Sequence, residues 1–263
     1  MRDLTLREDL HLALIQTDLV WHDPQANLNR FEALLEQAHG VDLIVLPEMF
    51  STGFSMNSAE LAEPEDGPST QWLLRMAVRM KAVITGTLII QAADGSYRNR
   101  LIWARPDGSM THYDKRHLFR MAGEHKYYTA GNQRVLQELK GWQIRPLICY
   151  DLRFPVWSRD PHSTDLLIYT ANWPAARRTH WNRLLPARAI ENLCYVAAVN
   201  RTGTDGKGHP YSGDSQVLDF QGESLLNCQN QPGVYRQTLS SAELAAYRER
   251  FPAYSDADDF ELN

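Results

Sequence analysis

Cysteine is scarce in this sequence, and its scarcity excludes a disulfide-stabilised fold. The chain of 263 residues holds three cysteines, Cys149, Cys194 and Cys228. Three thiols cannot all pair, and three in a chain of this length do not form a disulfide framework, so a reducing compartment is favoured. We interpret Cys194, at a predicted helix-to-strand passage, as a small buried hydrophobe and Cys228 as a loop thiol.

Long apolar runs are also missing. Charged residues interrupt every apolar stretch well before the roughly 20 residues that span a bilayer. Residues 1–9 carry acids and bases where a signal peptide has an apolar run, so no cleavable signal is expected. The sequence therefore predicts a cytoplasmic protein that does not bind membranes.

An excess of positive charge is absent, which argues against nucleic acid as a partner. The sequence has 27 Lys and Arg residues against 32 Asp and Glu residues, a formal net charge of −5. Metal motifs are absent too: despite nine histidines, neither H-E-x-x-H nor C-x-x-C occurs, so no metal site is predicted. Residues 203–208 (GTDGKG) lack the order of a phosphate-binding loop and are predicted to form a flexible turn.

The sequence does contain a regular alternation of apolar runs and helical patterns, which is typical of an α/β protein. We expect a helix directly after Asp23-Pro24 and further helices at about 69–80, 179–192 and 242–250. Strands are predicted at 11–17, 43–46, 83–90, 97–104, 110–113, 144–149, 166–170, 195–199, 215–218 and 234–238. Because no linker, low-complexity segment or repeat occurs, residues 1–263 are predicted to form one domain with an acidic tail from about residue 252.

Reactive side chains follow the ends of three predicted strands: Glu48, Lys115 and Cys149. Ligand sites in α/β proteins gather beyond the carboxyl ends of strands. A base, a cation and a thiol form a coherent set for acyl transfer. Most cysteines at the end of an apolar strand are simply buried. Residues 147–155 (LICYDLRFP), however, indicate a sharp strand exit that exposes the sulfur and frees the next backbone N–H.

Three sequence motifs resemble those of a known family. Residues 46–50 (LPEMF), 113–119 (YDKRHLF) and 148–155 (ICYDLRFP) are similar to the glutamate, lysine and cysteine motifs of the nitrilase (carbon–nitrogen hydrolase) superfamily, in the same order. The resemblance covers nearly the whole chain. It implies a four-layer α-β-β-α sandwich, a single carbon–nitrogen hydrolase domain, and assembly into a homodimer or a higher homo-oligomer.

The resemblance also implies roles for individual residues. Glu48 matches the general base, Lys115 the cation that stabilises the oxyanion, and Cys149 the nucleophile. Glu124 resembles a further glutamate of many members, although a loop glutamate before a basic pair is more often a solvated charge. Physical chemistry supports the set, because a free thiol is only slightly ionised at neutral pH and needs a base. We hypothesise that the backbone N–H of Tyr150 completes the oxyanion site, and that no metal or organic cofactor is required.

The substrate class is predicted from further motifs. Residues 47–54 (PEMFSTGF), 172–174 (NWP) and 180–192 are most similar to the omega-amidase branch, which hydrolyses the terminal amide of 2-oxoglutaramate and 2-oxosuccinamate to a 2-oxo dicarboxylate and ammonia. Two alternatives stay open at this point. One is another amidase of the superfamily, acting on deaminated glutathione or N-carbamoyl amines, and the other is a binding member without catalysis.

The residues that bind this small anionic amide are harder to predict. We expect the aromatic side chains of Phe50, Phe54 and Trp173 to form apolar walls of the pocket. The cation that holds the substrate carboxylate stays open among Arg120, Arg153, Arg177 and Arg178. Asp151 and Arg153 are expected to brace the strand exit, by pairing with each other or with the backbone.

Overall fold

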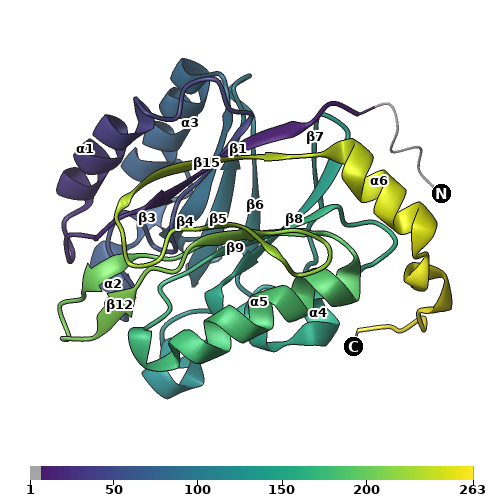
Figure 1. Cartoon of the computed structure of the whole chain (residues 1–263). Helices are drawn as coiled ribbons and strands as arrows, with labels where there is room; N and C mark the ends of the chain where they lie inside the picture. The colour runs from purple at the N-terminus through teal and green to yellow at the C-terminus, as the bar shows by residue number, and fades with distance from the viewer. Residues whose placement is uncertain (1–6, 263) are drawn as a thin grey trace.

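The computed structural model describes residues 7–262, so the prediction about a signal peptide at the N-terminus lies largely outside the described residues. Two large sheets pack face to face within this range (Figure 1). One sheet has the order β15 (Gly233–Leu239), β1 (Leu10–Gln16), β2 (Leu43–Val45), β4 (Val83–Gln91), β5 (Tyr97–Ala104) and β6 (Met110–Asp114), with β3 (Glu63–Pro64) beside β4. The other has the order β14 (Ser224–Asn227), β13 (Gln216–Leu218), β10 (Tyr195–Val199), β9 (Leu166–Thr170), β8 (Trp142–Ile148) and β7 (Gln137–Leu139).

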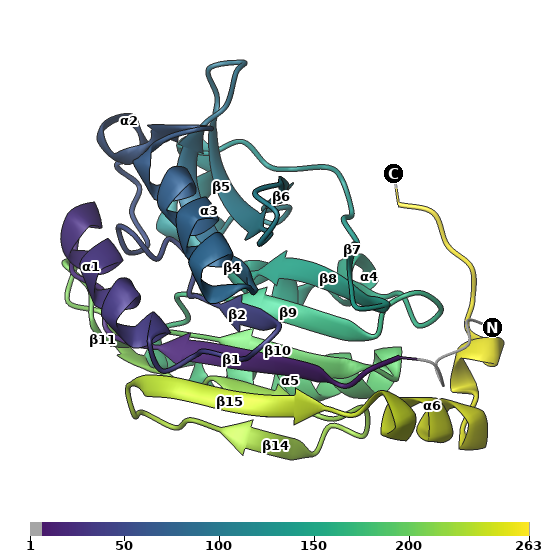
Figure 2. The same cartoon turned by 90° about the horizontal axis from the view of Figure 1, so that it is seen from above.

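Helices cover the outer face of each sheet. Helices α1 (Pro24–Leu35) and α3 (Pro68–Met80) lie side by side against the first sheet (Figure 2), and α5 (Arg178–Asn192) lies against the second. The short helices are α2 (Ser58–Leu61) and α4 (Pro155–Ser158), and α6 (Ser241–Arg250) follows β15. The predicted four-layer α-β-β-α sandwich is therefore confirmed.

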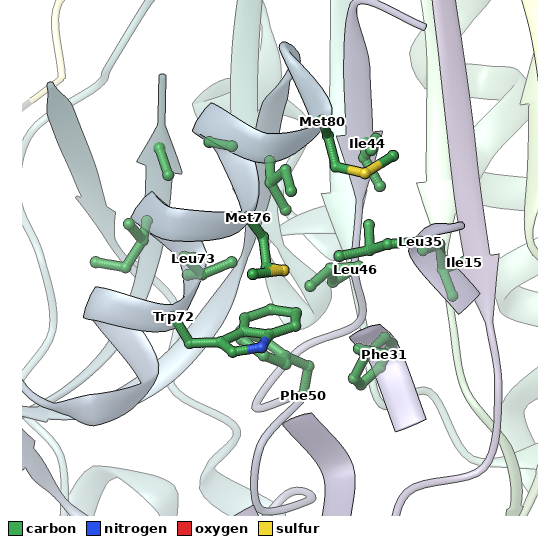
Figure 3. Packing of buried hydrophobic residues seen from close by; sticks show 14 of the residues in the cluster. Ile15, Phe31, Leu35, Ile44, Leu46, Phe50, Trp72, Leu73, Met76 and Met80 are labelled. Atoms are coloured by element: carbon green, nitrogen blue, oxygen red, sulfur yellow. The ribbon is translucent and has the colours of Figure 1, made fainter. Parts of the chain in front are cut away.

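Apolar contacts hold the layers together. Leu12 and Val45 of one sheet and Ile168 and Ala197 of the other belong to one buried cluster between the sheets. A second cluster fills the space between the first sheet and its helices, and Figure 3 shows Trp72 of α3 in that layer. Each fully buried aliphatic or aromatic side chain of this kind contributes about 1.5–3 kcal/mol.

Local sequence explains where the helices begin. The Asp23 carboxylate accepts a hydrogen bond from the N–H of Ala26, and Pro24 occupies the first turn of α1, where its missing N–H costs nothing. Helix α3 begins one residue earlier than expected, also at a proline, and ends where Lys81 adopts a left-handed conformation. The expected helix boundaries thus differ from the observed ones by about one residue.

Several short strands were not expected from the sequence. These are β3, β7, β14 and the hairpin of β11 (Thr202–Thr204) and β12 (Pro210–Ser212). Each has two to four residues, which is too short for an alternating apolar pattern to stand out. Residues 203–208 do contain a turn, but it is the tip of this hairpin, where the Asp205 carboxylate accepts hydrogen bonds from the N–H groups of Lys207 and His209.

The topology brings the ends of several strands to one edge of the sandwich. Strands β1, β2 and β4 are parallel in one sheet, and β8, β9 and β10 are parallel in the other. Residues that follow β2, β8 and β9 therefore meet between the two sheets. Among residues 7–262, no helix is both long and apolar enough to cross a membrane.

Candidate active site

Cys149 lies at the sharp strand exit that the sequence indicated. It follows the last residue of β8 with a φ of +42° and begins the 3-10 turn Cys149–Arg153. This left-handed conformation is unfavourable for a side chain other than glycine, so the surrounding contacts must hold it. The side chain is 9% exposed and lines a pocket, and its Sγ lies 3.9 Å from the backbone carbonyl oxygen of Asn172.

Glu48 lies fully buried beyond the end of β2. Its Oε1 accepts hydrogen bonds from Nζ of Lys115 and from Nδ2 of Asn99, both at 2.8 Å. Its Oε2 accepts one from the backbone N–H of Asn172 at 2.9 Å. Met49, the next residue, also has a left-handed backbone, with a φ of +43°. The carboxylate is therefore fixed by three donors and by a bent chain.

Lys115 directly follows β6, and its ammonium group is buried among carboxylates. Nζ lies 2.8 Å from Oε1 of Glu48 and 3.0 Å from each carboxylate oxygen of Glu124. Burial by itself lowers the pKa of Lys115, but the facing carboxylates of Glu124 and Glu48 outweigh it and hold the pKa above its usual value. Lys115 is thus a permanent cation.

Glu124 is a buried member of the same cluster and is not a solvated charge on a loop. It begins the 3-10 turn Glu124–Lys126, and its Oε2 accepts the backbone N–H of Phe119 at 2.5 Å. Burial raises the pKa of Glu124, and the nearby Glu48 adds to this, whereas Lys115 opposes it. The turn therefore places a second carboxylate in contact with the Lys115 ammonium group.

The Cys149 thiol keeps its proton in the resting site. Burial and the facing Glu48 raise its pKa well above the usual range, although Lys115 lowers it. Moving the thiol proton to Glu48 leaves the net charge of the buried cluster unchanged, whereas releasing it to water adds a negative charge to a buried site. The electrostatics favour an internal proton transfer.

Asp151 ties the cysteine turn to the segment after Lys115. Its carboxylate accepts the N–H of Ile148 at 3.0 Å, the hydroxyl of Tyr113 at 2.8 Å and the N–H of His117 at 3.0 Å. The expected brace to the backbone is present, but the pairing with Arg153 is not. Arg153 instead lies over the Trp173 ring, with its guanidinium carbon 4.8 Å from the centroid.

A pocket of about 270 Å³ opens over the cluster. Phe54, Trp173 and Tyr150 line it, as do Lys115 and Cys149. Its other lining residues are Met56, Phe119, Met121, Ala122, Arg153, Asn172, Pro174, Ala176, Arg177, Asp205, Lys207, His209, Pro210 and Tyr211. The walls are largely apolar, whereas the charged side chains are mostly cationic.

Phe50 does not line the pocket, so the expectation that it forms a wall is wrong. Its ring lies in the layer between the first sheet and the helices, beside Phe31 and Trp72 (Figure 3). A Cβ atom on Gly86 would come within 2.9 Å of this ring, which therefore occupies the space over that glycine. The chain reverses at Met49, and Phe50 turns toward the helices, where its burial is stabilising.

The structure shows which of the four candidate arginines line the pocket. Arg153 and Arg177 line the pocket. Arg178 is bound to Asp214, with its Nε 2.6 Å from a carboxylate oxygen, and neither Arg178 nor Arg120 is among the lining residues. Arg177 lies over the ring of Phe119, 5.0 Å from its centroid. Two cations therefore stand above the buried cluster.

Sequence reasoning missed several residues of the site. Asn99 and Asn172 contact Glu48, and the hairpin that begins at Thr202 supplies one wall of the pocket. Asn99 is a buried polar residue in the polar first half of a strand whose second half is apolar (residues 97–104, YRNRLIWA), which is a weak signal in a single sequence. Asn172 lies beyond the carboxyl end of β9, a position that predicts a ligand contact.

The chain is similar to known amidases along nearly its whole length. The chain is 53% identical to the omega-amidase YafV of Yersinia enterocolitica over 96% of its own length and 98% of that protein. It is 34% identical to the 2-oxoglutaramate amidase of Bacillus subtilis (strain 168) over 93% of its own length and 96% of that protein.

A solved structure is also similar. A CN-hydrolase superfamily protein from Xanthomonas campestris, crystallised with an arsenic adduct in its active site, is 47% identical, with a TM-score of 0.95 over 97% of this chain and 100% of that chain. Residues 11–249 match the family described as carbon-nitrogen hydrolase. As the three motifs implied, this chain belongs to the carbon–nitrogen hydrolase family.

Proposed function

We propose that this protein is an omega-amidase that hydrolyses the terminal amide of 2-oxoglutaramate and 2-oxosuccinamate. The observation that carries the proposal is one arrangement: a thiol, two carboxylates and an ammonium lie together beside a pocket that Arg153 and Arg177 also line. The buried cluster suits amide cleavage, and the arginines suit an anionic amide. The similarity to omega-amidases along nearly the whole chain supports the same substrates.

In the first half of the reaction, the thiol attacks the amide carbon. The proton leaves Sγ of Cys149 for the carboxylate of Glu48, and the thiolate forms a bond to carbon. The oxyanion is stabilised by the Lys115 ammonium and the backbone N–H of Tyr150. Glu48 then gives its proton to the nitrogen as the C–N bond breaks. Ammonia departs and an acyl thioester remains.

In the second half, water replaces ammonia. Glu48 takes a proton from the water as its oxygen attacks the thioester carbon, and Glu124 positions Glu48 through Lys115. The C–S bond breaks, and the proton returns to the sulfur. The new carboxylic acid releases its remaining proton to solvent, and the product is a 2-oxo dicarboxylate. These steps use only water and groups of the chain itself, and they need no metal or organic cofactor.

The carboxylate of the substrate is held at the mouth of the pocket. Arg177 lies over Phe119 and Arg153 over Trp173, so both guanidinium planes are oriented by aromatic rings. Burial and the neighbouring Arg177 lower the pKa of Arg153, which reflects two cations placed close together. A bound carboxylate relieves that repulsion. The alkyl part of the substrate contacts Phe54 and Trp173.

Assembly and location complete the proposal. We propose a cytoplasmic homodimer or higher homo-oligomer. Cys149, Cys194 and Cys228 are all free thiols, which suits a reducing compartment. Ile190 of α5 is 53% exposed, and we place the contact between copies of the chain at this residue.

Ammonia release tests the proposed function directly. The assay compares 2-oxoglutaramate with glutamine, deaminated glutathione, an N-carbamoyl amine and a simple nitrile. We expect the highest kcat/KM for 2-oxoglutaramate and no turnover above background for Cys149→Ala. A preference for another substrate would refute the omega-amidase assignment. Undiminished turnover by Cys149→Ala would refute the thioester mechanism, and no turnover of any amide would favour a binding protein.

A further inference from the structure

Asn99 contacts each charged member of the buried cluster. It lies on β5 and is 1% exposed. Its Nδ2 group donates to Oε1 of Glu48 at 2.8 Å and to Oε1 of Glu124 at 3.1 Å. Its backbone carbonyl accepts the N–H of Lys115 at 3.0 Å. Asn99 is not among the pocket-lining residues, so it acts on the cluster from behind and does not reach the substrate.

The two carboxylates fix the orientation of the Asn99 amide. Both N–H bonds of Nδ2 are used, one for each carboxylate. The opposite flip would place Oδ1 against two anions. Within the described residues, Oδ1 itself is buried without a hydrogen-bond partner. A buried acceptor without a partner is destabilising, so the favourable contacts of this side chain are its two donated hydrogen bonds.

Counting lone pairs on Glu48 shows what one of these donors does. A carboxylate oxygen accepts two hydrogen bonds well. Oε1 of Glu48 already has two donors, Nζ of Lys115 and Nδ2 of Asn99, whereas Oε2 has one, the N–H of Asn172. A proton that arrives from Cys149 therefore finds its free lone pair on Oε2. The hydrogen bond from Asn99 occupies the lone pair of Oε1 that could otherwise accept this proton.

We propose that Asn99 is a positioning residue of the proposed reaction: it holds the carboxylates of Glu48 and Glu124 side by side and directs the thiol proton to Oε2 of Glu48. The step balances within the site. The S–H bond of Cys149 breaks, the O–H bond at Oε2 forms, and the electron pair stays on sulfur for the attack. The inference rests on the proposed function, because it assigns Glu48 as the base.

Other titratable groups that face the cluster do not change charge at neutral pH. Lys115 has a raised pKa and stays cationic, and the Cys149 thiol has a raised pKa and stays protonated until Glu48 accepts its proton. The hydroxyls of Tyr128 and Tyr211 are within electrostatic reach of Glu48, and burial raises the pKa of both, so both stay neutral. An acid limb in the pH profile therefore reports the two carboxylates.

Asn99→Leu tests this role because it removes both donors at similar volume. Without them the two facing carboxylates repel each other more, so the pair takes up a proton at higher pH. We expect the acid limb of the pH profile of kcat/KM for 2-oxoglutaramate to move up by about one pH unit. At a pH on the acid side of the limb, kcat/KM then falls about tenfold. The loss shrinks as pH rises, and KM stays within about twofold because the pocket is unchanged.

Two further variants keep the test decisive. Asn192→Leu is the matched control, since Asn192 is a fully buried asparagine that bonds to Arg188 and Asp160 and touches no catalytic group. It is expected to lower stability without moving the acid limb. Asn99→Ser keeps one donor and is expected to move the limb about half as far as Asn99→Leu; it replaces the leucine variant if that one does not fold.

Alkylation of Cys149 separates this inference from the proposed function. Iodoacetamide labelling, read by mass spectrometry against buried Cys194, needs no substrate and depends on Glu48 as base. An acid limb of labelling that moves up by about one unit in Asn99→Leu supports the inference even if 2-oxoglutaramate is not hydrolysed. If the acid limbs of hydrolysis and of alkylation in Asn99→Leu match those in Asn192→Leu, the inference about Asn99 is overturned. The omega-amidase proposal is left intact by that result.

Discussion

Lys115 is the residue on which the buried cluster depends. It is 1% exposed and neutralises part of the charge of Glu48 and Glu124, which are both fully buried. Two carboxylates cannot stay ionised together in a water-poor site without such a partner. The ammonium that would stabilise the oxyanion in catalysis is therefore also a structural requirement of the folded state.

Lys115→Met is expected to destabilise the fold by about 3–5 kcal/mol at neutral pH. The two buried carboxylates lose their cation and their pKa values rise above those in the unfolded chain. The native state then binds more protons, so the loss is largest at neutral pH and shrinks as pH falls toward 4. Urea unfolding at several pH values measures it.

Lys140→Met is the control for that experiment. Lys140 pairs with Glu8 and Asp42 at the surface, where screening keeps an ion pair below about 1 kcal/mol. Similar small losses in both variants would contradict the proposed dependence of the cluster on Lys115.

Arg177→Met and Arg153→Met are expected to raise KM for 2-oxoglutaramate by about 10–100-fold each, since a hydrogen bond to a charged group contributes about 1.5–3 kcal/mol. Hydrolysis of a neutral amide such as acetamide should change little. Arg178→Met is the control, because Arg178 is bound to Asp214 outside the pocket. Steady-state ammonia release gives the three values, and an equal effect on the neutral amide would rule out carboxylate binding.

At the scale of elements, Asp151 joins two strand ends. It links the turn after β8 to the segment after β6 through Ile148, Tyr113 and His117. Cys149 and Lys115 follow strands of different sheets, so the separation between their side chains depends on such a link. Trp157 of α4 extends it, because its indole N–H donates to the Tyr113 hydroxyl at 2.9 Å.

Asp151→Asn is expected to cost about 3 kcal/mol of stability, because the new amide N–H₂ faces groups that are themselves donors. We also expect kcat to fall about 100-fold, since a small misplacement of reacting groups has an effect of that size. Chemical unfolding and steady-state kinetics measure the two effects.

Asp219→Asn is the matched control for Asp151. Asp219 accepts the N–H groups of Gln221 and Glu223 in a surface turn, so its loss should leave kcat unchanged. A full kcat in Asp151→Asn would contradict the role of the link.

At the scale of the whole molecule, the side chains around the pocket are mainly cationic, whereas the net charge of the chain is negative. The chain has a formal charge of −5, yet the pocket is lined by Arg153, Arg177 and Lys207, in addition to Lys115, whose charge is offset by Glu48 and Glu124. The lining carboxylate, Asp205, is engaged by its own hairpin and by the Tyr211 hydroxyl. An anionic substrate is therefore attracted by the field of the pocket, which acts at shorter range than the net charge.

A homodimer or larger assembly is expected to elute with a mass at least twice 30.1 kDa in light scattering coupled to size exclusion. Ile190→Glu should shift it toward the monomer, because it places a charge on the exposed outer face of α5. Val78→Glu on α3 is the matched control, since Val78 and Ile190 are both 53% exposed. A monomeric wild-type chain would refute the proposed assembly.

The sequence by itself determined most of the elements, and the roles of the site residues are predictions from motifs that resemble those of the nitrilase superfamily. Apolar periodicity and proline positions predicted the α/β alternation, and three strand-end motifs predicted Glu48, Lys115 and Cys149 as one set. These are local signals, because a strand or a strand exit leaves its pattern in neighbouring residues. The same locality explains why short strands such as β7 and β14 were missed.

Only the tertiary structure decided which side chains share the site. Phe50 and Phe54 are four residues apart, yet the turn at Met49 sends one into the core and the other to the pocket. Glu124 and Asn99 join the cluster, Arg178 leaves it for Asp214, and the hairpin at 202–212 becomes a wall. Burial, hydrogen bonding and the meeting of two sheets depend on residues far apart in sequence, and no local pattern records them.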